Sequence, residues 1–433
     1  MTDRILIRTT GQTGPGIAEH LADTSDAHDA SAISVLDTAG NYTATDVEGV
    51  FVELASRSRP GNRVIWFGDS ITSGSAGTSI SGQGTSALVL DAKGFHNWAN
   101  VMLRHALDFR GNAGVSGNST TQMLARISEV LAVASDWVVV LGGTNDSVDA
   151  TTTQTALTSI YTTLMAAGRR VVACTIPPTT SAAAGIETLR TTANNWIRTY
   201  ARSTPGIVLA DLAAAYVDPS GSGFKALSTA THDGVHPNSY GAMRMGRVLA
   251  DAMRPHIAIS NDQLTHQGDA TNFLSNPVVT GSGSSRPTDW TGAGTATFSY
   301  ADRTDAVSGK WFQAVCTVGN SQFTQLNTSL TGSLAVGAQV QAMVEFEVDA
   351  TAAASTGPAL VCQCYNGSTF TTKAYDLYAD AGASYGAAPY PLTSGVLQTP
   401  PLTIPSGTTL VQVVFSNGEG TYRFARFSLR VVG

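Results

Sequence analysis

The sequence predicts an α/β domain with a parallel sheet, followed by a domain of antiparallel β-strands. In residues 61–256, short apolar runs alternate with segments in which apolar residues recur every three or four positions. Strands that alternate with amphipathic helices are typical of βαβ units and a parallel sheet. In residues 257–433 the helical periodicity fades, and short segments of alternating apolar residues are separated by turn-forming clusters. This second pattern indicates an antiparallel β-sandwich.

Residues 1–60 differ from both later regions and are interpreted as an attachment or oligomerisation segment. They are rich in Asp, Ala, Thr and Gly, and one helix signal stands out at 45–54. Thr45 and Glu48 fit a capping box, and apolar residues follow at helical spacing. A short amphipathic helix cannot bury its apolar side alone. It therefore either packs on the neighbouring domain or associates with other copies of the chain.

The middle and last regions contain the apolar runs that we predict as strands. In the middle region these runs are 64–67, 137–141, 170–175 and 207–210, and in the last region they are 340–348, 411–415 and 427–431. Helices are expected between the runs of the middle region and after Pro237. The polar inserts 73–93 and 177–186 are expected to be loops at the rim of the site. We place the boundary between the two regions in the polar stretch 261–269.

Composition narrows the class of protein. A chain of 433 residues is long enough for two or three domains, and 42% hydrophobic residues can bury large cores. Charged residues make up only 13%, about half the usual share, which is typical of β-rich extracellular or virion proteins. The net charge of −7 argues against nucleic acid as a partner. No apolar stretch is long enough for a signal peptide or a membrane span, so we expect a soluble protein that is not inserted in a membrane.

The four cysteines do not form a metal-binding pattern. Cys174 lies in an apolar run and is expected in the core. Cys362 and Cys364 share one face of a strand, where a mutual disulfide has poor geometry, whereas Cys316 could pair with either of them. No Cys/His spacing resembles a zinc site. Neither a metal nor another cofactor is expected.

Four short blocks in the middle region supply, in order, the groups that acyl transfer requires. The hydroxyl of Ser70 is a poor nucleophile until a base takes its proton, and His236 can be that base. Asp233, three residues before His236, can orient the imidazole and stabilise its charged form. The side-chain amide of Asn145, the backbone N–H of Gly117 and the backbone N–H of Ser70 can form an oxyanion hole.

Each of these residues also has a simpler interpretation. Ser70 could cap a helix or turn, Gly117 could be an ordinary turn glycine, and His236 could be an exposed loop residue. Asn145 could cap a turn through its side chain. The catalytic interpretation is favoured because every block lies at the end of a predicted strand or in the loop after it, where open parallel sheets place their sites.

The four blocks resemble those of the SGNH (GDSL-like) hydrolase family over residues 61–256. The resemblance implies a flavodoxin-like α/β/α sandwich and the hydrolysis of esters, thioesters or acetylated sugars. It assigns the roles described above to the same residues of this chain. It also implies that Asp69 and Asp146, beside the site, are mainly structural and bond to loop backbone.

Residues 26–34 and 42–51 resemble a segment that recurs in phage tail fibres and minor tail proteins. This resemblance implies other phage tail proteins as partners and a place in the virion, acting outside the cell at the host surface. By analogy with fibres it implies a homotrimer. His28, within this segment, is expected to be a turn or interface residue and not a metal ligand.

The last region resembles jelly-roll modules that bind carbohydrate on secreted and viral proteins. The resemblance begins at Asn-Phe-Leu-Ser-Asn-Pro, residues 272–277. Aromatic side chains on its surface would stack on sugar rings, while buried ones would belong to the core. The sequence leaves both possibilities open for Trp290, Trp311, Tyr375, Tyr378 and Tyr390.

Together these observations predict a phage tail protein whose serine esterase removes acyl or acetyl groups from an acylated glycan or lipid of the host envelope. The alternative is a receptor-binding or structural tail subunit that retains the hydrolase fold only as a scaffold. A third hypothesis is a free cytosolic thioesterase or lysophospholipase. The presence of regions 1–60 and 257–433 on either side of the hydrolase region argues against it.

Overall fold

The computed structural model divides into two compact units, Met1–Gly61 and Asn62–Gly433. The described residues are 6–9, 33–36, 61–74, 87–221, 223–259, 264–266, 268–284, 286–287, 289–305, 307–317, 321–327, 330, 333–349, 357–378 and 392–432. In the first unit, β1 (Leu6–Thr9) pairs antiparallel with β2 (Ile33–Leu36). The predicted helix at 45–54, His28 and nearly all of the segment that resembles tail proteins lie outside the described residues. Among the described helices, none combines the length and apolar content needed to cross a membrane.

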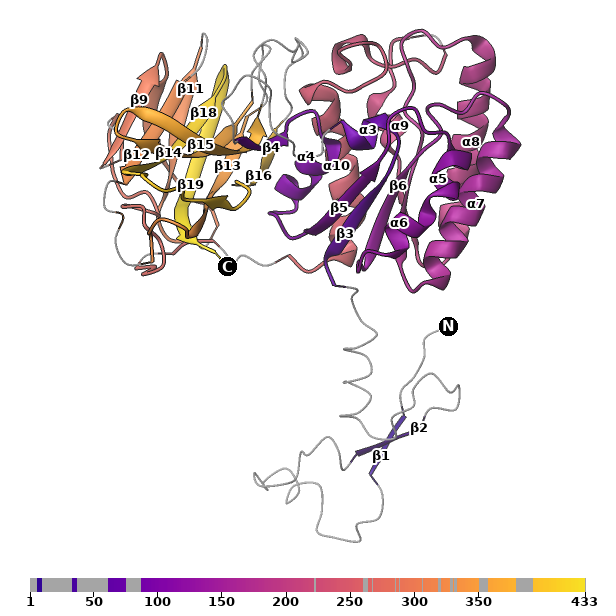
Figure 1. Ribbon diagram of the computed structural model, residues 1–433, viewed down its shortest axis with the longest axis horizontal. Coiled ribbons are helices and arrows are strands. Elements are labelled where there is room, and N and C mark those ends of the chain that lie inside the picture. The colour runs from indigo at the N-terminus through magenta and orange to yellow at the C-terminus, as the bar shows by residue number, and fades with distance from the viewer. Residues whose placement is uncertain are drawn as a thin grey trace. The chain divides into compact units, whose positions relative to one another are not determined.

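A five-stranded parallel sheet forms the centre of the α/β region (Figure 1). Its order is β5–β3–β6–β7–β8, and the strands are β3 (Arg63–Gly68), β5 (Asp108–Gly114), β6 (Trp137–Leu141), β7 (Arg170–Cys174) and β8 (Ile207–Ala210). Numbered within the sheet, this is the order 2-1-3-4-5 of flavodoxin-like doubly wound folds. The prediction of a parallel-sheet α/β domain is confirmed.

Both faces of this sheet are buried. In β3, Val64 and Trp66 belong to one hydrophobic core, while Ile65 and Phe67 belong to the core on the opposite face. A strand buried on both faces reads as a continuous apolar run, and this explains why four of the strands could be predicted. The edge strand β5 lacks such a run, because its residues are exposed or half-buried, and the sequence did not predict it.

Helices cover the two faces of the sheet (Figure 1). The face that contains Val64 packs against α4 (Phe95–Met102), α9 (Leu212–Tyr216) and α10 (Ser239–Met253). The opposite face packs against α5 (Thr120–Ala125), α6 (Ile127–Leu131), α7 (Ala150–Ala166) and α8 (Ala184–Ser203). A single turn, α3 (Ser70–Ser73), follows β3, and 3₁₀ turns lie at Ser228–Ala230 and Arg254–His256.

The last region forms two sheets whose strands pair antiparallel, as predicted, with one exception. One sheet contains β10 (Thr297–Asp302), β11 (Lys310–Cys316), β19 (Gly420–Val431), β13 (Gln339–Val348), β16 (Thr393–Gln398) and the short β17 (Leu402–Thr403). The other contains β4 (Ala87–Asp91), β15 (Thr369–Tyr378), β14 (Ala359–Asn366), β18 (Leu410–Asn417), β12 (Ser321–Asn327) and β9 (Trp290–Gly294). The jelly-roll topology and the domain limits 1–60, 61–256 and 257–433 stay predictions.

The exception is β4, which comes from the insert 73–93 that was predicted to be a loop. This strand pairs parallel with β15 at the edge of the second sheet. The prediction was wrong there because a short apolar run within a polar insert, Ala87-Leu88-Val89-Leu90, was overlooked as a strand signal. The insert 177–186 is also shorter as a loop than predicted, because α8 begins at Ala184.

The cysteines and three of the candidate sugar-stacking aromatics are buried. None of the four cysteines, all of which are described, forms a disulfide. The suggested pairing of Cys316 is absent because Cys316 lies in β11, while Cys362 and Cys364 lie in β14 of the other sheet. Trp290, Trp311 and Tyr375 are each less than 10% exposed. They belong to the core and offer no open ring face to a sugar. The side chains of Tyr378 and Tyr390 lie outside the described ones.

A buried glutamate connects the α/β region to the last region. Glu345, on β13, accepts hydrogen bonds from Arg104 (2.7 Å), Arg303 (2.9 Å) and Arg426 (2.6 and 2.7 Å). Burial raises the pKa of the Glu345 carboxyl, but the hydrogen bonds from Arg426 and Arg303 outweigh burial and hold this pKa below its usual value. The carboxylate is therefore charged in the folded protein and pairs with three guanidinium groups.

We expect Glu345→Gln to lower the free energy of unfolding by roughly 3–5 kcal/mol at pH 7, because it leaves the buried guanidinium of Arg426 without its counter-charge and removes one of the two anionic partners of Arg303. Since the folded pKa is lowered, this stabilisation is complete above the ordinary carboxyl pKa and is lost as pH falls through the folded value. Urea unfolding at several pH values measures both effects. The control is Glu347→Gln on the same strand. The side chain of Glu347 is 37% exposed and lies 3.6 Å from Arg423, so this ion pair should contribute under about 1 kcal/mol. Equal losses in the two variants would contradict this expectation.

Candidate active site

The four sequence blocks meet at the carboxyl edge of the parallel sheet. Ser70 follows β3, the turn that contains Gly117 follows β5, and Asn145 follows β6. Asp233 and His236 lie in the loop before α10. This is the edge at which open parallel sheets place their ligands, so loops that are distant in the chain contribute side chains to one place.

Ser70 is positioned by a tight turn between β3 and α3. A Cβ atom on Gly68 would lie 2.1 Å from Thr72 Oγ1 and 2.5 Å from the carbonyl oxygen of Leu141, so only glycine fits where the strand ends. Asp69 then caps α3, because its Oδ1 accepts a hydrogen bond from the backbone N–H of Ile71 at 2.9 Å. Ser70 becomes the first residue of the helical turn and is half-buried.

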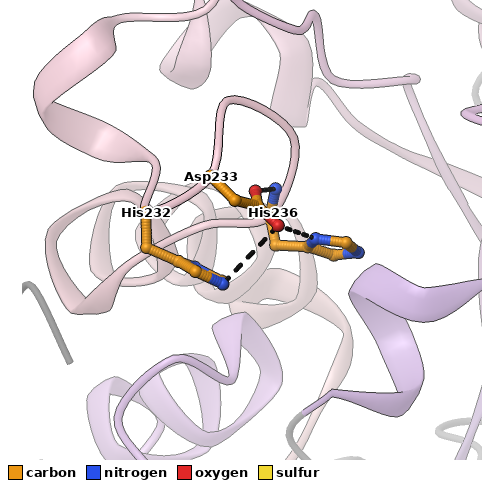
Figure 2. A group of neighbouring side chains, drawn as sticks. All are labelled: His232, Asp233 and His236. Atoms are coloured by element: carbon orange, nitrogen blue, oxygen red, sulfur yellow. Dashed lines mark hydrogen bonds and ion pairs between the residues drawn. The ribbon is translucent and has the colours of Figure 1, made fainter.

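The side chains of Ser70, His236 and Asp233 form a continuous hydrogen-bonded chain. His236 Nε2 lies 2.8 Å from Ser70 Oγ, and His236 Nδ1 lies 2.6 Å from Asp233 Oδ2. Figure 2 shows the second of these contacts, with the carboxylate and the imidazole facing each other. Since a carboxylate can only accept, the proton of the neutral ring lies on Nδ1, and the lone pair of Nε2 faces the hydroxyl.

Asp233 is held as an anion. Its Oδ1 accepts hydrogen bonds from the backbone N–H groups of Val235 (2.9 Å) and His236 (2.7 Å). Partial burial raises the pKa of the Asp233 carboxyl, but the hydrogen bonds from the His236 side chain and from these two N–H groups together lower it far below its usual range. A fixed negative charge beside Nδ1 favours the tautomer in which Nε2 acts as a base.

Hydrogen bonds within the loop that holds Asp233 and His236 fix its conformation. Thr231 Oγ1 donates to the carbonyl oxygen of His236 (2.8 Å) and accepts from the N–H of Gly234 (2.9 Å). Asn238 caps α10 by accepting from the N–H of Gly241 (3.0 Å). The imidazole is therefore fixed at the start of a buried helix. The His236 side chain loses little conformational entropy when it accepts the proton of Ser70.

One predicted oxyanion residue, Asn145, contacts the turn that contains the other, Gly117. The N–H of Asn118 donates to the carbonyl oxygen of Val115 (3.2 Å), and Gly117, in the third position, has φ of +79°, as a type II turn requires. The Nδ2 of Asn145 donates to the carbonyl oxygen of Asn118 at 3.0 Å. Both simpler interpretations thus describe real contacts. They do not exclude the oxyanion role, since the amide has a second N–H and both residues are exposed at the site.

Arg126 supports this turn, and the sequence reasoning missed it. Its guanidinium donates to the carbonyl oxygens of Gly68 (2.8 Å) and Ala113 (2.8 Å) and to Asn118 Oδ1 (2.7 Å). One side chain therefore ties the ends of β3 and β5 to the oxyanion turn. No sequence signal distinguishes Arg126 from a surface arginine, because its partners are mostly backbone carbonyls.

The resemblance implies that the two carboxylates beside the site bond to loop backbone; both accept a backbone N–H, and Asp146 also accepts from side-chain hydroxyls. Asp146 accepts hydrogen bonds from the N–H and hydroxyl of Thr120 (2.8 and 2.5 Å) and from the hydroxyl of Thr153 (2.7 Å). It thereby links the start of α5 to α7. Burial raises the pKa of Asp69 to about 6, although the hydrogen bond from the backbone N–H of Ile71 opposes this rise.

A hollow of about 240 Å³ opens beside the serine and the histidine. It is lined by Ser70, Ile71, Gly74, Lys93, Ser116, His232, His236 and Pro237. A larger hollow of about 490 Å³ elsewhere contains none of the predicted site residues, so the smaller one is the relevant site. Of the described residues, the group whose spacing suits a metal ion is His232, Asp233 and His236.

We expect Asn145→Ala to lower kcat for a p-nitrophenyl ester by roughly 10²–10³-fold with little change in KM, since an oxyanion donor acts mainly in the transition state. Steady-state kinetics measure this separation. Ser147→Ala is the control, because Ser147 is exposed two residues further along the same loop. A loss that appears in KM and not in kcat would argue against the oxyanion role.

Comparison with known proteins gives a match to one family model. Residues 66–244 match the model of the GDSL-like Lipase/Acylhydrolase family, a range that includes all four blocks. No curated protein matches this chain.

Solved structures similar to this chain include a GDSL-like lipase from Bacteroides thetaiotaomicron, with 20% identity and a TM-score of 0.35 over 48% of this chain and 97% of that chain. An acetylxylan esterase from Geobacillus stearothermophilus has 21% identity and a TM-score of 0.35 over 45% of this chain and 95% of its own. An alpha/beta hydrolase from the metagenome of Lake Arreo, Spain, has 18% identity and a TM-score of 0.36 over 46% and 98%.

Proposed function

We propose that the GDSL-like hydrolase domain of this chain is a serine esterase with Ser70 as nucleophile, His236 as base and Asp233 as the residue that orients the base. The observation that carries the proposal is the pair of contacts at His236, 2.8 Å to Ser70 Oγ and 2.6 Å to Asp233 Oδ2. Hydrogen-bonded nucleophile, base and orienting group are the arrangement that activates a serine hydroxyl.

The reaction proceeds through an acyl-enzyme. Ser70 Oγ attacks the ester carbonyl carbon while His236 Nε2 takes the hydroxyl proton. The carbonyl oxygen becomes negative and is stabilised by N–H groups of Asn145, Gly117 and Ser70. Collapse of this intermediate breaks the bond to the alcohol, which leaves with the proton from His236. Water then attacks the acyl-enzyme by the same steps and releases the acid.

The substrate we propose is an acylated glycan or lipid of a host envelope that carries a short acyl group such as acetyl. The hollow beside Ser70, about 240 Å³, is smaller than typical pockets for drug-sized ligands, which supports a small acyl group. Asn145 and Gly117 are exposed, and this suits an ester on a large polymer whose remaining parts stay outside the hollow.

The setting we propose is a phage tail, with other tail proteins as partners, a homotrimeric state, and action from the virion at the host surface. Support comes from the resemblance of residues 26–34 and 42–51 to tail proteins and from the low share of charged residues, 13%. Sedimentation equilibrium of the full chain tests the oligomer. A mass three times that of the 44.9 kDa chain is expected, and a monomer at all concentrations would contradict the trimer.

Incubation with bacterial envelope fractions tests the substrate. The wild-type chain should release an acid that mass spectrometry identifies, and Ser70→Ala should release none. If wild type hydrolyses a model ester but releases no acid from any fraction, the proposed substrate class is wrong while the esterase stands. If wild type binds cells but hydrolyses neither the model ester nor any envelope fraction, the alternative of a receptor-binding tail subunit is favoured.

A further inference from the structure

The proposed reaction does not use His232, although this residue lies beside both Asp233 and His236. Its Nε2 is 3.7 Å from Asp233 Oδ2, and its ring stacks on that of His236 with centroids 5.9 Å apart. Figure 2 shows the carboxylate of Asp233 between the two imidazoles. One nitrogen from each histidine and one oxygen of the aspartate all lie within 4.8 Å of one another.

The hydrogen bonds of His232 leave its second nitrogen as an acceptor. Nδ1 lies 3.3 Å from the carbonyl oxygen of Pro237, and because a carbonyl can only accept, Nδ1 carries the proton of the neutral ring. The lone pair of Nε2 then faces Asp233 Oδ2, which is also an acceptor. Two acceptors 3.7 Å apart cannot hydrogen bond to each other, but they are close enough to bind the same cation.

The backbone holds these groups in place. The N–H of His232 donates to the carbonyl oxygen of His236 (3.2 Å), and Asp233 Oδ1 is fixed by two backbone N–H groups. The three side chains are between 33% and 43% exposed, and both histidines line the hollow beside Ser70. An ion can therefore reach a group of ligands that is already assembled.

We propose that His232 Nε2, Asp233 Oδ2 and His236 Nδ1 form a binding site for a late first-row transition-metal ion such as Zn²⁺, and that the bound ion switches the esterase off. Two imidazoles and one carboxylate are a ligand set that zinc uses, with water in the fourth position. Imidazole nitrogen also favours zinc over magnesium and calcium, which prefer oxygen ligands.

The switch follows from the tautomer of His236. A metal ion at Nδ1 needs the lone pair there, so the Nδ1 proton must move to Nε2. Nε2 then donates to Ser70 Oγ where it previously accepted, and the hydroxyl keeps its proton. The ring stays neutral, and no electron is transferred. The same ion removes Asp233 from its role as partner of Nδ1. This second part of the proposal rests on the proposed esterase function, whereas binding of the ion does not.

Isothermal titration of the untagged full chain with Zn²⁺ tests the site without relying on activity. Ser70→Ala serves as the reference protein, and His232→Gln is added to it. We expect the double variant to bind Zn²⁺ about tenfold more weakly or worse. His256→Gln on the same background is the matched control and should bind as the reference does, since His256 lies beside Trp137, away from this group. Equal affinity with and without His232 would overturn the site.

Inhibition tests the switch. Hydrolysis of p-nitrophenyl acetate is measured against Zn²⁺ concentration, with each variant normalised to its own metal-free rate. Wild type should be inhibited and should recover on addition of EDTA, while Mg²⁺ at the same concentration has no effect. In His232→Gln the half-inhibiting Zn²⁺ concentration should rise about tenfold or more. The same inhibition curve in both proteins would overturn the switch. If wild type hydrolyses no ester, the proposed function fails, and the titration still decides the metal site.

Discussion

Replacement of Ser70 by Ala is expected to lower kcat for p-nitrophenyl acetate by roughly 10⁴- to 10⁶-fold. The hydroxyl donates a 2.8 Å hydrogen bond to His236 Nε2. No other described side chain that lines the hollow beside His236 combines a nucleophilic atom with a contact to that nitrogen. KM should change little, because the lost group acts in the chemical step. Stopped-flow and steady-state assays on the purified full chain measure both constants.

The control for this variant is Ser73→Ala, which removes a hydroxyl from the same helical turn. Ser73 Oγ contacts the carbonyl oxygen of Ser70 (3.3 Å) and Ser116 Oγ (3.1 Å) but not His236. We expect it to retain turnover of the same order as wild type. Comparable activity in Ser70→Ala and wild type, with both folded by circular dichroism, would remove Ser70 from the mechanism.

Asp233→Asn should lower kcat by roughly 10³- to 10⁴-fold, the order seen when the orienting carboxylate of a serine hydrolase becomes an amide. The Asn oxygen can still accept from the backbone N–H groups of Val235 and His236, so the loop should keep its shape. The amide nitrogen, however, would donate to His236 Nδ1 and force the proton onto Nε2. The base would then face Ser70 in the wrong tautomer.

The pH dependence separates this loss from simple titration. Hydrogen bonds lower the pKa of Asp233 far below its usual range, so the carboxylate stays charged at any pH used for an esterase assay. Raising the pH should therefore not rescue Asp233→Asn, because its loss comes from the tautomer of the ring. Asp218→Asn, which changes an aspartate bonded to Ser220 in a separate loop, is the matched control. Recovery of Asp233→Asn at high pH would contradict the tautomer argument.

The sequence predicts the central sheet well, and the reason is physical. β3, β6, β7 and β8 are buried on one or both faces, so each needs a run of apolar residues that is visible without a structure. β5 escaped prediction because its exposed and half-buried residues form no apolar run, and β4 escaped because its short apolar run lies within a polar insert. The position of each of these strands is fixed by pairing with a strand that is distant in the sequence, and local sequence patterns do not reveal such pairing.

The candidate site shows the same division. Gly68, Asp69 and Ser70 form a local turn, and Asp233 lies three residues before His236, so the proximity within each group could be predicted from spacing. Contacts that join distant segments could not. Arg126 uses backbone carbonyls as partners, the three arginines of the Glu345 cluster come from three separate segments, and the position of His232 depends on how its loop closes.

The most direct test of the central claim is covalent labelling of the full chain with a fluorophosphonate, followed by peptide mapping by mass spectrometry. Such reagents react with a serine hydroxyl only when a neighbouring base activates it. We predict a single adduct on the peptide that contains Ser70, absent from Ser70→Ala and formed far more slowly in His236→Ala. An adduct on another serine, or labelling of Ser70 at the same rate without the imidazole, would contradict the proposal that these two side chains act together.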